Sequence, residues 1–411
     1  MNRTAVGCGA IALGAAGVCG LAYLGTAVLA ALGAPEQLAV AVVTGSLAWL
    51  AAGVGLIFLT EARRGGAVAS ARPFGPAHPL AWLGLMAAVL LAGRVVLIAG
   101  IPAVTAVAFP PLHVLAALAP ALAIAAHLAW RSGRPAWLTW SGVVRQLVWG
   151  AGVAAVIAAV AETVAMVILI GLALVALAQT ADGRALLDAG AAVVGRCGPA
   201  VATPPAGCEA ELTAILRDAA HNPVVALAVF GLAVVIAPMI EELAKAAGVA
   251  RRRPASRAQA WVWGACTGAG FGVLEAVLYG ALGLNLAVWS TTLLARACAT
   301  LMHATMTAVA GVGWYAGTVE GDWRTAARNL VLAMAGHGAW NALTFLAVWA
   351  AFIGQDAGPP AGTVLTGLAT VAALGVILVF NTIFVGFLWR SARYGGTIAA
   401  ETGLAKNLPP V

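Results

Sequence analysis

Apolar runs longer than about 18 residues recur along this sequence, and they constrain its fold more than any other feature. Each run is long enough for a helix that crosses the ~30 Å hydrocarbon core of a bilayer. Hydrophobic residues make up 62% and charged residues 9% of the 411 residues, which excludes a soluble globular protein. We therefore expect an all-α, polytopic integral membrane protein with about ten transmembrane helices. The expected spans are 5–32, 37–60, 80–101, 104–130, 146–178, 223–245, 259–282, 288–316, 329–353 and 363–389.

The same pattern predicts how the chain is divided. We expect an N-terminal five-span region at 1–178, an extracytoplasmic loop at 179–222, a second membrane core at 223–390 and a tail at 391–411. The first region has few polar residues inside its spans. Among them is His113, for which we expect a structural role.

Lys and Arg residues predict the orientation. They gather in alternate segments between the spans, as in the turn Arg251-Arg252-Arg253, and are sparse in the 179–222 loop. Because cytoplasmic segments of membrane proteins carry an excess of these residues, we expect a multi-pass protein of the cell membrane with both termini in the cytoplasm. The net charge of +7 is then mostly a topology signal, with anionic lipid as a partner and no reason to invoke nucleic acid. The scarcity of Lys beside abundant Ala, Gly and Arg indicates a GC-rich bacterial genome.

Two of the six cysteines, Cys197 and Cys208, share the expected extracytoplasmic loop. In an oxidising exterior they can form a disulfide. Two unpaired thiols are the alternative.

A pair of adjacent carboxylates, Glu241 and Glu242, directly follows the apolar run that begins at Pro223. A charged residue at the centre of a membrane helix costs ~2.5–3.5 kcal/mol on insertion scales, so an acidic pair at the edge of a span is a candidate functional site. Lys245 follows Glu241 by four residues, which is ion-pair spacing on a helix. Interfacial charges at a helix end are the simpler interpretation of this segment alone.

The next span carries a further carboxylate, Glu275, well inside its apolar run. Intramembrane carboxylates usually face a site or a pathway rather than lipid. Gly268 and Gly272 lie four residues apart before it and permit a close approach of another helix.

Two later spans carry polar stripes. In the eighth span Arg296, Thr300 and His303 follow the i, i+4, i+7 spacing of one helix face, and in the ninth His337 and Asn341 are four residues apart. A single buried His is most often a satisfied core residue. Polar residues of these types on four successive spans instead indicate one buried site.

Hydrolytic chemistry would account for this set. A buried carboxylate can activate water as a general base, and the side chains of His337 and Asn341 can stabilise the oxyanion that forms when water attacks an amide carbon. Alternatively, Glu and His side chains can bind a divalent metal that activates its water. The sequence contains neither HExxH nor CxxC.

These residues also carry a family resemblance. Glu241-Glu-Leu-Ala-Lys245, Phe271-Gly-Val-Leu-Glu275, Arg296 with His303, and His337-Gly-Ala-Trp-Asn341 resemble the motifs of PrsW-type intramembrane proteases. More distantly they resemble the CAAX prenyl protease and bacteriocin-processing superfamily. The resemblance covers roughly Pro223 to Phe352, and Ala276 stands where the family commonly has Asn.

The resemblance implies cleavage of a membrane protein substrate, such as an anti-sigma factor. It implies that Glu241 and Glu242 supply the base and its support, and that Glu275 takes the place of a histidine in the prenyl-protease relatives. It also implies that His303 positions water or a metal, and that His337 and Asn341 form the oxyanion site. A proton-coupled transporter, with Glu275 and His303 as a relay, and a non-catalytic membrane scaffold are the alternatives.

Metal dependence is left open by the sequence. Glu275, His303 and His337 offer the His₂Glu set of hydrolytic zinc sites. The depths of these residues in the membrane argue against a shared metal. At 1.5 Å per residue, Glu275 lies ~24 Å from the start of the seventh span, whereas His337 lies ~12 Å from the start of the ninth. A tilt, or a break at Gly268–Gly272, would be needed to bring them level. Metal-free catalysis by glutamate is the alternative.

Overall fold

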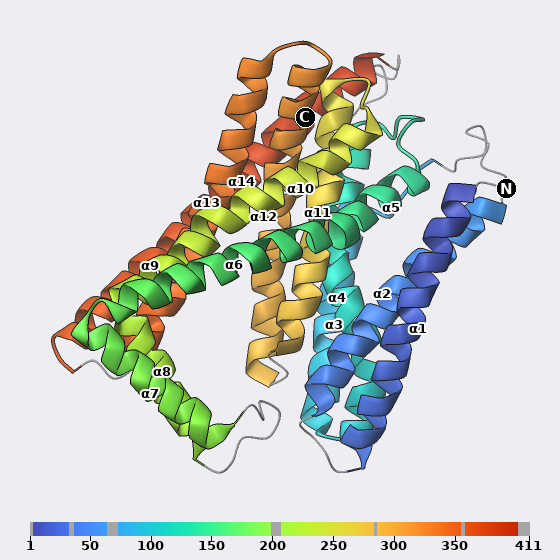
Figure 1. Ribbon diagram of the computed structural model, residues 1–411. Coiled ribbons are helices and arrows are strands. Elements are labelled where there is room, and N and C mark those ends of the chain that lie inside the picture. Colours follow the sequence, from blue (N-terminus) through green and yellow to red (C-terminus); the bar gives the residue numbers. More distant parts are fainter. Residues whose placement is uncertain are drawn as a thin grey trace. The chain divides into compact units, whose positions relative to one another are not determined.

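The structure is a computed structural model that describes residues 3–32, 37–63, 73–198, 207–282, 286–354 and 358–401 (Figure 1). Within these residues, ten helical segments are long and apolar enough to cross a membrane. They confirm the predicted all-α, polytopic membrane protein. Residues 199–206 of the expected loop and 402–411 of the expected tail lie outside the described residues.

The predicted spans differ from the observed helices mainly at their ends. The fifth begins earlier, at Trp140, and the sixth continues to Arg252. The helices are α1 (Arg3–Ala31), α2 (Gln37–Arg63), α3 (Pro79–Ala99), α4 (Pro102–Arg131), α5 (Trp140–Val148), η2 (Trp149–Ala154), α6 (Ala155–Ala178), α7 (Ala181–Cys197), α8 (Cys208–His221), α9 (Pro223–Phe230), η3 (Gly231–Ile236), α10 (Ala237–Arg252), α11 (Arg257–Leu282), α12 (Leu286–Thr318), α13 (Trp323–Gly354) and α14 (Ala361–Glu401).

The helices form two compact units that are interleaved along the chain. Unit 1 comprises Met1–Ala155, Ala244–Leu332 and Ile383–Val411, and unit 2 comprises Val156–Leu243 and Ala333–Thr382. The boundary near residue 244 falls inside the continuous helix α10. Each unit has its own packing.

The core of unit 1 is built around α11, which packs against α2, α4, α5, η2 and α12. Glycines allow the backbones to touch on one side. A Cβ at Gly150 would lie 1.9 Å from the carbonyl oxygen of Thr267, and one at Gly270 would lie 2.1 Å from that of Leu147. Because no side chain fits between them, α11 is fixed closely against the α5–η2 segment.

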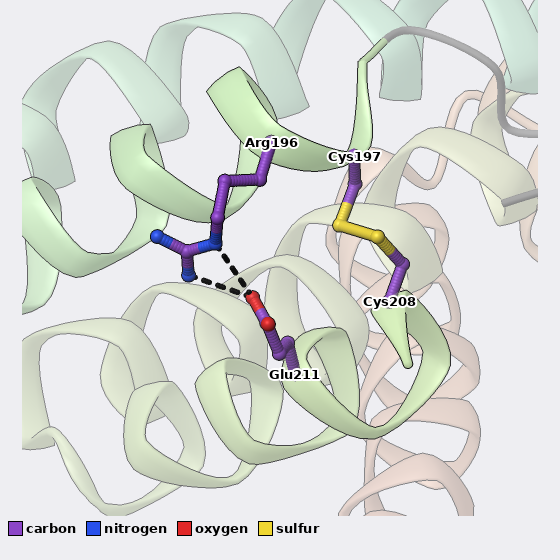
Figure 2. Close-up of a disulfide and its surroundings, with 4 residues drawn as sticks. All are labelled: Arg196, Cys197, Cys208 and Glu211. Atoms are coloured by element: carbon purple, nitrogen blue, oxygen red, sulfur yellow. Dashed lines mark hydrogen bonds and ion pairs between the residues drawn. A yellow bond between two sulfur atoms is a disulfide. The ribbon is translucent and has the colours of Figure 1, made fainter. Parts of the chain in front are cut away.

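Unit 2 contains a helical hairpin within the stretch predicted as an extracytoplasmic loop. Helices α7 and α8 are joined by the Cys197–Cys208 disulfide, with a Cα–Cα distance of 5.8 Å, which confirms the predicted bridge (Figure 2). Beside it, the guanidinium of Arg196 donates two hydrogen bonds, of 3.1 and 2.6 Å, to one carboxylate oxygen of Glu211 (Figure 2). A single residue, Asn222, connects this hairpin to α9.

Candidate functional site

A stripe of three glycines, four residues apart on α11, brings this helix into backbone contact with α12 in unit 1. A Cβ added at Gly264, Gly268 or Gly272 would lie 2.5 Å from Thr307 O, 2.1 Å from His303 O or 2.8 Å from Thr300 Cα. The close approach predicted from two of these glycines is confirmed. No break occurs at them, since α11 is one α-helix from Arg257 to Leu282. The contact places the polar face of α12 directly against α11.

Glu275 lies at the centre of a polar cluster between these two helices. One of its carboxylate oxygens, Oε2, is 2.5 Å from Arg296 Nη2 and 2.5 Å from His303 Nε2. The carboxylate and the guanidinium are about one fifth exposed, whereas the His303 side chain is 2% exposed. Arg296 also lies over the ring of Tyr279, 5.0 Å from its centroid. The predicted stripe on α12 therefore meets the predicted carboxylate of α11.

Lys245 joins this cluster from α10. Its side chain is fully buried, its Nζ is 3.0 Å from His303 Nδ1, and it lies 3.9 Å from the centroid of the Phe271 ring. An ammonium group can only donate hydrogen bonds, so Nδ1 is the acceptor. The proton of neutral His303 is then on Nε2, where it is donated to Glu275. Lys245 and Glu275 together fix both the orientation and the tautomer of His303.

Unit 2 holds a second polar cluster, formed by two helices. His337 on α13 has Nδ1 3.1 Å from Glu242 Oε1 and Nε2 3.9 Å from Glu241 Oε2. All three side chains are buried, and that of Glu242 is fully inaccessible. An ionised carboxylate can only accept hydrogen bonds, so Nδ1 carries the proton of neutral His337. The lone pair of Nε2 then faces Glu241.

Asn341, one turn after His337, donates a hydrogen bond of 2.9 Å from Nδ2 to the carbonyl oxygen of Ala233 in η3. In this π-helical segment the N–H of Ala237 donates to Leu232 O. With the same five-residue spacing, the donor to Ala233 O would be residue 238, which is a proline and has no N–H. Asn341 therefore supplies the hydrogen bond that Pro238 cannot give to Ala233.

The structure brings the six predicted site residues together in two groups. Glu275 and His303 are in contact within unit 1, and Glu241 and Glu242 flank His337 within unit 2, with Asn341 on the same helix as His337. That all six serve one site stays a prediction. Two further residues, Lys245 and Arg296, contact the predicted ones directly but were assigned no role from the sequence. Two sequence features point to them: Lys245 lies within the glutamate motif, and Arg296 begins the polar stripe of α12.

The donor atoms of unit 2 fit a divalent metal. Zinc–nitrogen and zinc–oxygen bonds are about 2.0–2.2 Å, so two ligands of one tetrahedral ion lie about 3.4 Å apart. The 3.9 Å between His337 Nε2 and Glu241 Oε2 exceeds this spacing by about 0.5 Å, which a small rotation of either side chain would remove. Glu242, on the other ring nitrogen, occupies the place of the outer carboxylate that metal-binding histidines usually have.

The atoms of Glu275 and His303 fit a metal less well in the arrangement observed. Glu275 Oε2 already contacts a guanidinium and an imidazole, and both ring nitrogens of His303 have partners. An ion at these atoms would have to replace Arg296 or Lys245. These contacts argue against Glu275 as the carboxylate ligand of a zinc ion, the role that the His₂Glu set of the sequence analysis would give it.

Comparisons with known proteins agree with the resemblance seen in the motifs. No curated protein and no solved structure matches the chain. A family model does match, over somewhat less than half of the chain and including every residue of both clusters. Residues 191–380 match the model described as PrsW family intramembrane metalloprotease, which supports intramembrane proteolysis by this part of the chain.

Proposed function

We propose that this protein is an intramembrane peptidase that hydrolyses a peptide bond of a membrane-embedded or membrane-proximal protein by attack of an activated water. The observation that carries the proposal is the buried arrangement of His337 between Glu242, at 3.1 Å, and Glu241, at 3.9 Å. Ionisable side chains are costly in an apolar environment, and those found within membrane spans commonly mark functional sites. The family match over 191–380 supports the same reaction class.

Glu241 is the proposed proton acceptor. Its carboxylate faces the lone pair of His337 Nε2, so a water molecule bound between the two can give its proton to Glu241 as its oxygen attacks the carbonyl carbon. The attack forms the new C–O bond of a tetrahedral intermediate. Its collapse breaks the C–N bond as the proton held by Glu241 passes to the leaving amine nitrogen. Glu242 is a positioning residue that holds the tautomer of His337.

Asn341 is the proposed oxyanion donor. A carboxamide has two N–H groups, and Ala233 O accepts only one hydrogen bond from Nδ2. The second N–H can be donated to the developing oxyanion. Neutral His337 cannot share this role through Nε2, because its proton is on Nδ1. It becomes a donor there only as an imidazolium.

A divalent metal, such as zinc, fits the same atoms. His337 Nε2 and Glu241 would hold it, with Glu242 fixing the ring of His337 from the other side. When bound, the ion supplies a water of lowered pKa and polarises the scissile carbonyl. His303 remains a proposed positioning residue for this water or ion, as the sequence resemblance implies, and Glu275 orients its ring through the 2.5 Å contact with Nε2.

The proposed substrate is a membrane-anchored regulatory protein such as an anti-sigma factor. The resemblance to PrsW-type proteases and the intramembrane position of the glutamates support a substrate that reaches the bilayer. The proposed location is the cell membrane of a bacterium, with both termini in the cytoplasm, because of the alternation of Lys and Arg between spans.

Anionic lipid is the proposed partner of the cytoplasmic surface. Within the described residues of unit 1, five guanidinium groups lie 5.1–6.0 Å from the centroids of Trp rings. These pairs are Arg131 with Trp130, Arg251 with Trp149, Arg252 with Trp263, Arg390 with Trp261, and Arg393 with Trp389. Two of these rings, Trp130 and Trp389, are exposed. Exposed Trp side chains favour the membrane–water interface, so these two would hold Arg131 and Arg393 at the depth of lipid phosphates.

Proteomics of membrane-released fragments tests the function. Cells expressing the wild type should release fragments that are absent with the Glu241→Gln/Glu242→Gln variant, since Gln keeps the shape and removes the charge. Glu162→Gln, which removes a carboxylate from α6 outside the cluster, is the matched control and should leave the fragments unchanged. Equal fragment release by the double variant and the wild type would refute the protease assignment and leave the transporter and scaffold alternatives.

Metal analysis of the purified protein tests the metal. The expected result is about one bound ion per chain, lost together with activity on chelation, restored by Zn²⁺ and absent from His337→Ala. Full activity of metal-free protein would show that Glu241 acts on water without an ion.

A further inference from the structure

A buried pair of rings links α4, in the first half of the chain, to both helices of the Glu275 cluster. His113 on α4 and Trp289 on α12 are both fully buried. His113 Nε2 is 2.9 Å from the carbonyl oxygen of Val277 on α11, and the indole N–H of Trp289 donates a hydrogen bond of 3.0 Å to His113 Nδ1. One imidazole thus bridges three helices of unit 1.

One protonation state of His113 satisfies both bonds. An indole nitrogen can only donate, so Nδ1 accepts, and the proton of the neutral ring is on Nε2, where Val277 O accepts it. The ring needs no charge and leaves neither nitrogen without a partner. Such a fully satisfied buried network fixes the geometry of the groups that it joins.

Both rings occupy space that glycines leave open. A Cβ at Gly280 on α11 would lie 2.5 Å from His113 Cε1, and one at Gly93 on α3 would lie 2.3 Å from the Trp289 ring. Phe109, one turn before His113, packs on Trp289 with a centroid distance of 4.8 Å. The rings are therefore held by shape as well as by hydrogen bonds, and the position of α4 along α11 and α12 is fixed.

We propose that His113 is a positioning residue for Glu275 and Arg296. Val277, which His113 binds, is two residues beyond Glu275, and Trp289 is two helical turns before Arg296. By joining α11 and α12 at these points, His113 sets the register that lets Glu275 Oε2 meet Arg296 at 2.5 Å. The first five spans, which lie outside the matched segment 191–380, thereby take part in shaping the cluster. The predicted effect of His113 on catalysis rests on the proposed function. Its predicted effect on the packing of α11 and α12 does not.

The experiment compares His113→Leu with His113→Gln. Leu removes both hydrogen bonds, whereas a carboxamide can accept from Trp289 and donate to Val277 O. The matched control is His127→Leu on the same helix, because His127 Nε2 has no hydrogen-bond partner within the described residues. Two readouts are taken on monodisperse, folded protein well below its melting temperature: kcat and KM for a substrate found by fragment proteomics, and the alkylation rate of the native Cys298.

Cys298 reports on the helices independently of catalysis. It is two residues after Arg296 on α12 and half-buried, while Cys266 on α11 is buried and serves as the internal reference. Mass spectrometry of the alkylated peptides separates the two. A loosened α12 should expose Cys298 and leave Cys266 unchanged.

His113→Leu should lower kcat about 10- to 100-fold, the effect of displacing a positioned group by ~1 Å, with KM changed less than about threefold. It should also speed Cys298 alkylation, and His113→Gln should reverse both effects. An unchanged alkylation rate in His113→Leu overturns the proposal, as does a Gln variant that is no better than the Leu variant. If the chain proves not to be a protease, the alkylation rates still decide whether His113 sets the register of α11 and α12.

Discussion

The contact between α11 and α12 at Gly268 leads to a quantitative prediction for Gly268→Ala. A Cβ there would lie 2.1 Å from His303 O and 2.5 Å from His303 C, whereas real Cβ contacts essentially never fall below 3.0 Å. The obstructing atoms are backbone, so no side-chain rotation relieves the clash, and the helices must separate locally by about 0.9 Å, the difference between 3.0 and 2.1 Å. The 2.5 Å contact between His303 Nε2 and Glu275 then lengthens beyond a good hydrogen bond.

The expected loss of stability follows from two opposing effects. Overpacking costs about 1–3 kcal/mol, while replacing a helical glycine by alanine contributes up to about 1 kcal/mol in helix propensity. Gly84→Ala on α3 isolates the second effect, because nothing lies within 4 Å of its added Cβ. Gly268→Ala should therefore be about 1–3 kcal/mol less stable than Gly84→Ala.

Thermal unfolding in detergent, followed by Trp fluorescence, measures this difference, and release of the substrate fragment measures activity. Activity of folded Gly268→Ala should fall about 100-fold, as expected for a displacement of ~1 Å at a positioned group, while Gly84→Ala keeps wild-type activity. A Gly268→Ala protein with the melting temperature and activity of Gly84→Ala would refute the close approach of α11 and α12 at His303.

Two further predictions concern other contacts. Glu275→Gln and Arg296→Gln should each destabilise the protein by about 3 kcal/mol, because each leaves the largely buried charge of the other residue without this ion pair. The double variant should lose less than the sum of the two, and additive losses in thermal unfolding would argue against the pair. In intact cells, an impermeant maleimide should label Cys197 and Cys208 only after reduction, since they are bridged and expected outside the membrane. Labelling without reduction would contradict the bridge, and labelling only after the cells are opened would reverse the orientation.

Features that depend on local pattern could be predicted from the sequence. The ten spans follow from runs of apolar residues, because a backbone in lipid must satisfy its own hydrogen bonds within a helix. The stripe that includes Arg296 and His303 follows from the helical period, which places both on the face that meets Glu275. The bridge between Cys197 and Cys208 was one of two alternatives, and the structure decides between them.

Partners far apart in the sequence could not be predicted in this way. Helical spacing directs attention from Lys245 to Glu241, whereas the structure places the Lys245 ammonium within hydrogen-bond distance of His303, 58 residues away. His113 and Trp289 are 176 residues apart, and nothing in either local pattern indicates the other. Which polar groups meet in a membrane bundle is set by helix packing, and here the packing depends on where glycines allow backbones to touch.

The segment before the glutamate pair links local sequence to the chemistry of the cluster in unit 2. Pro238, three residues before Glu241, removes one backbone N–H, and the helix before it widens into the π turn η3. A carbonyl left without a donor in the apolar surroundings of a membrane span costs about 1–3 kcal/mol, and Asn341 offsets this cost through its bond to Ala233 O. The same side chain is the proposed oxyanion donor, so its amide has both a structural and a chemical role. A serine or a histidine at this position could donate only one hydrogen bond when neutral, whereas a carboxamide donates two, which gives a physical reason for asparagine at 341.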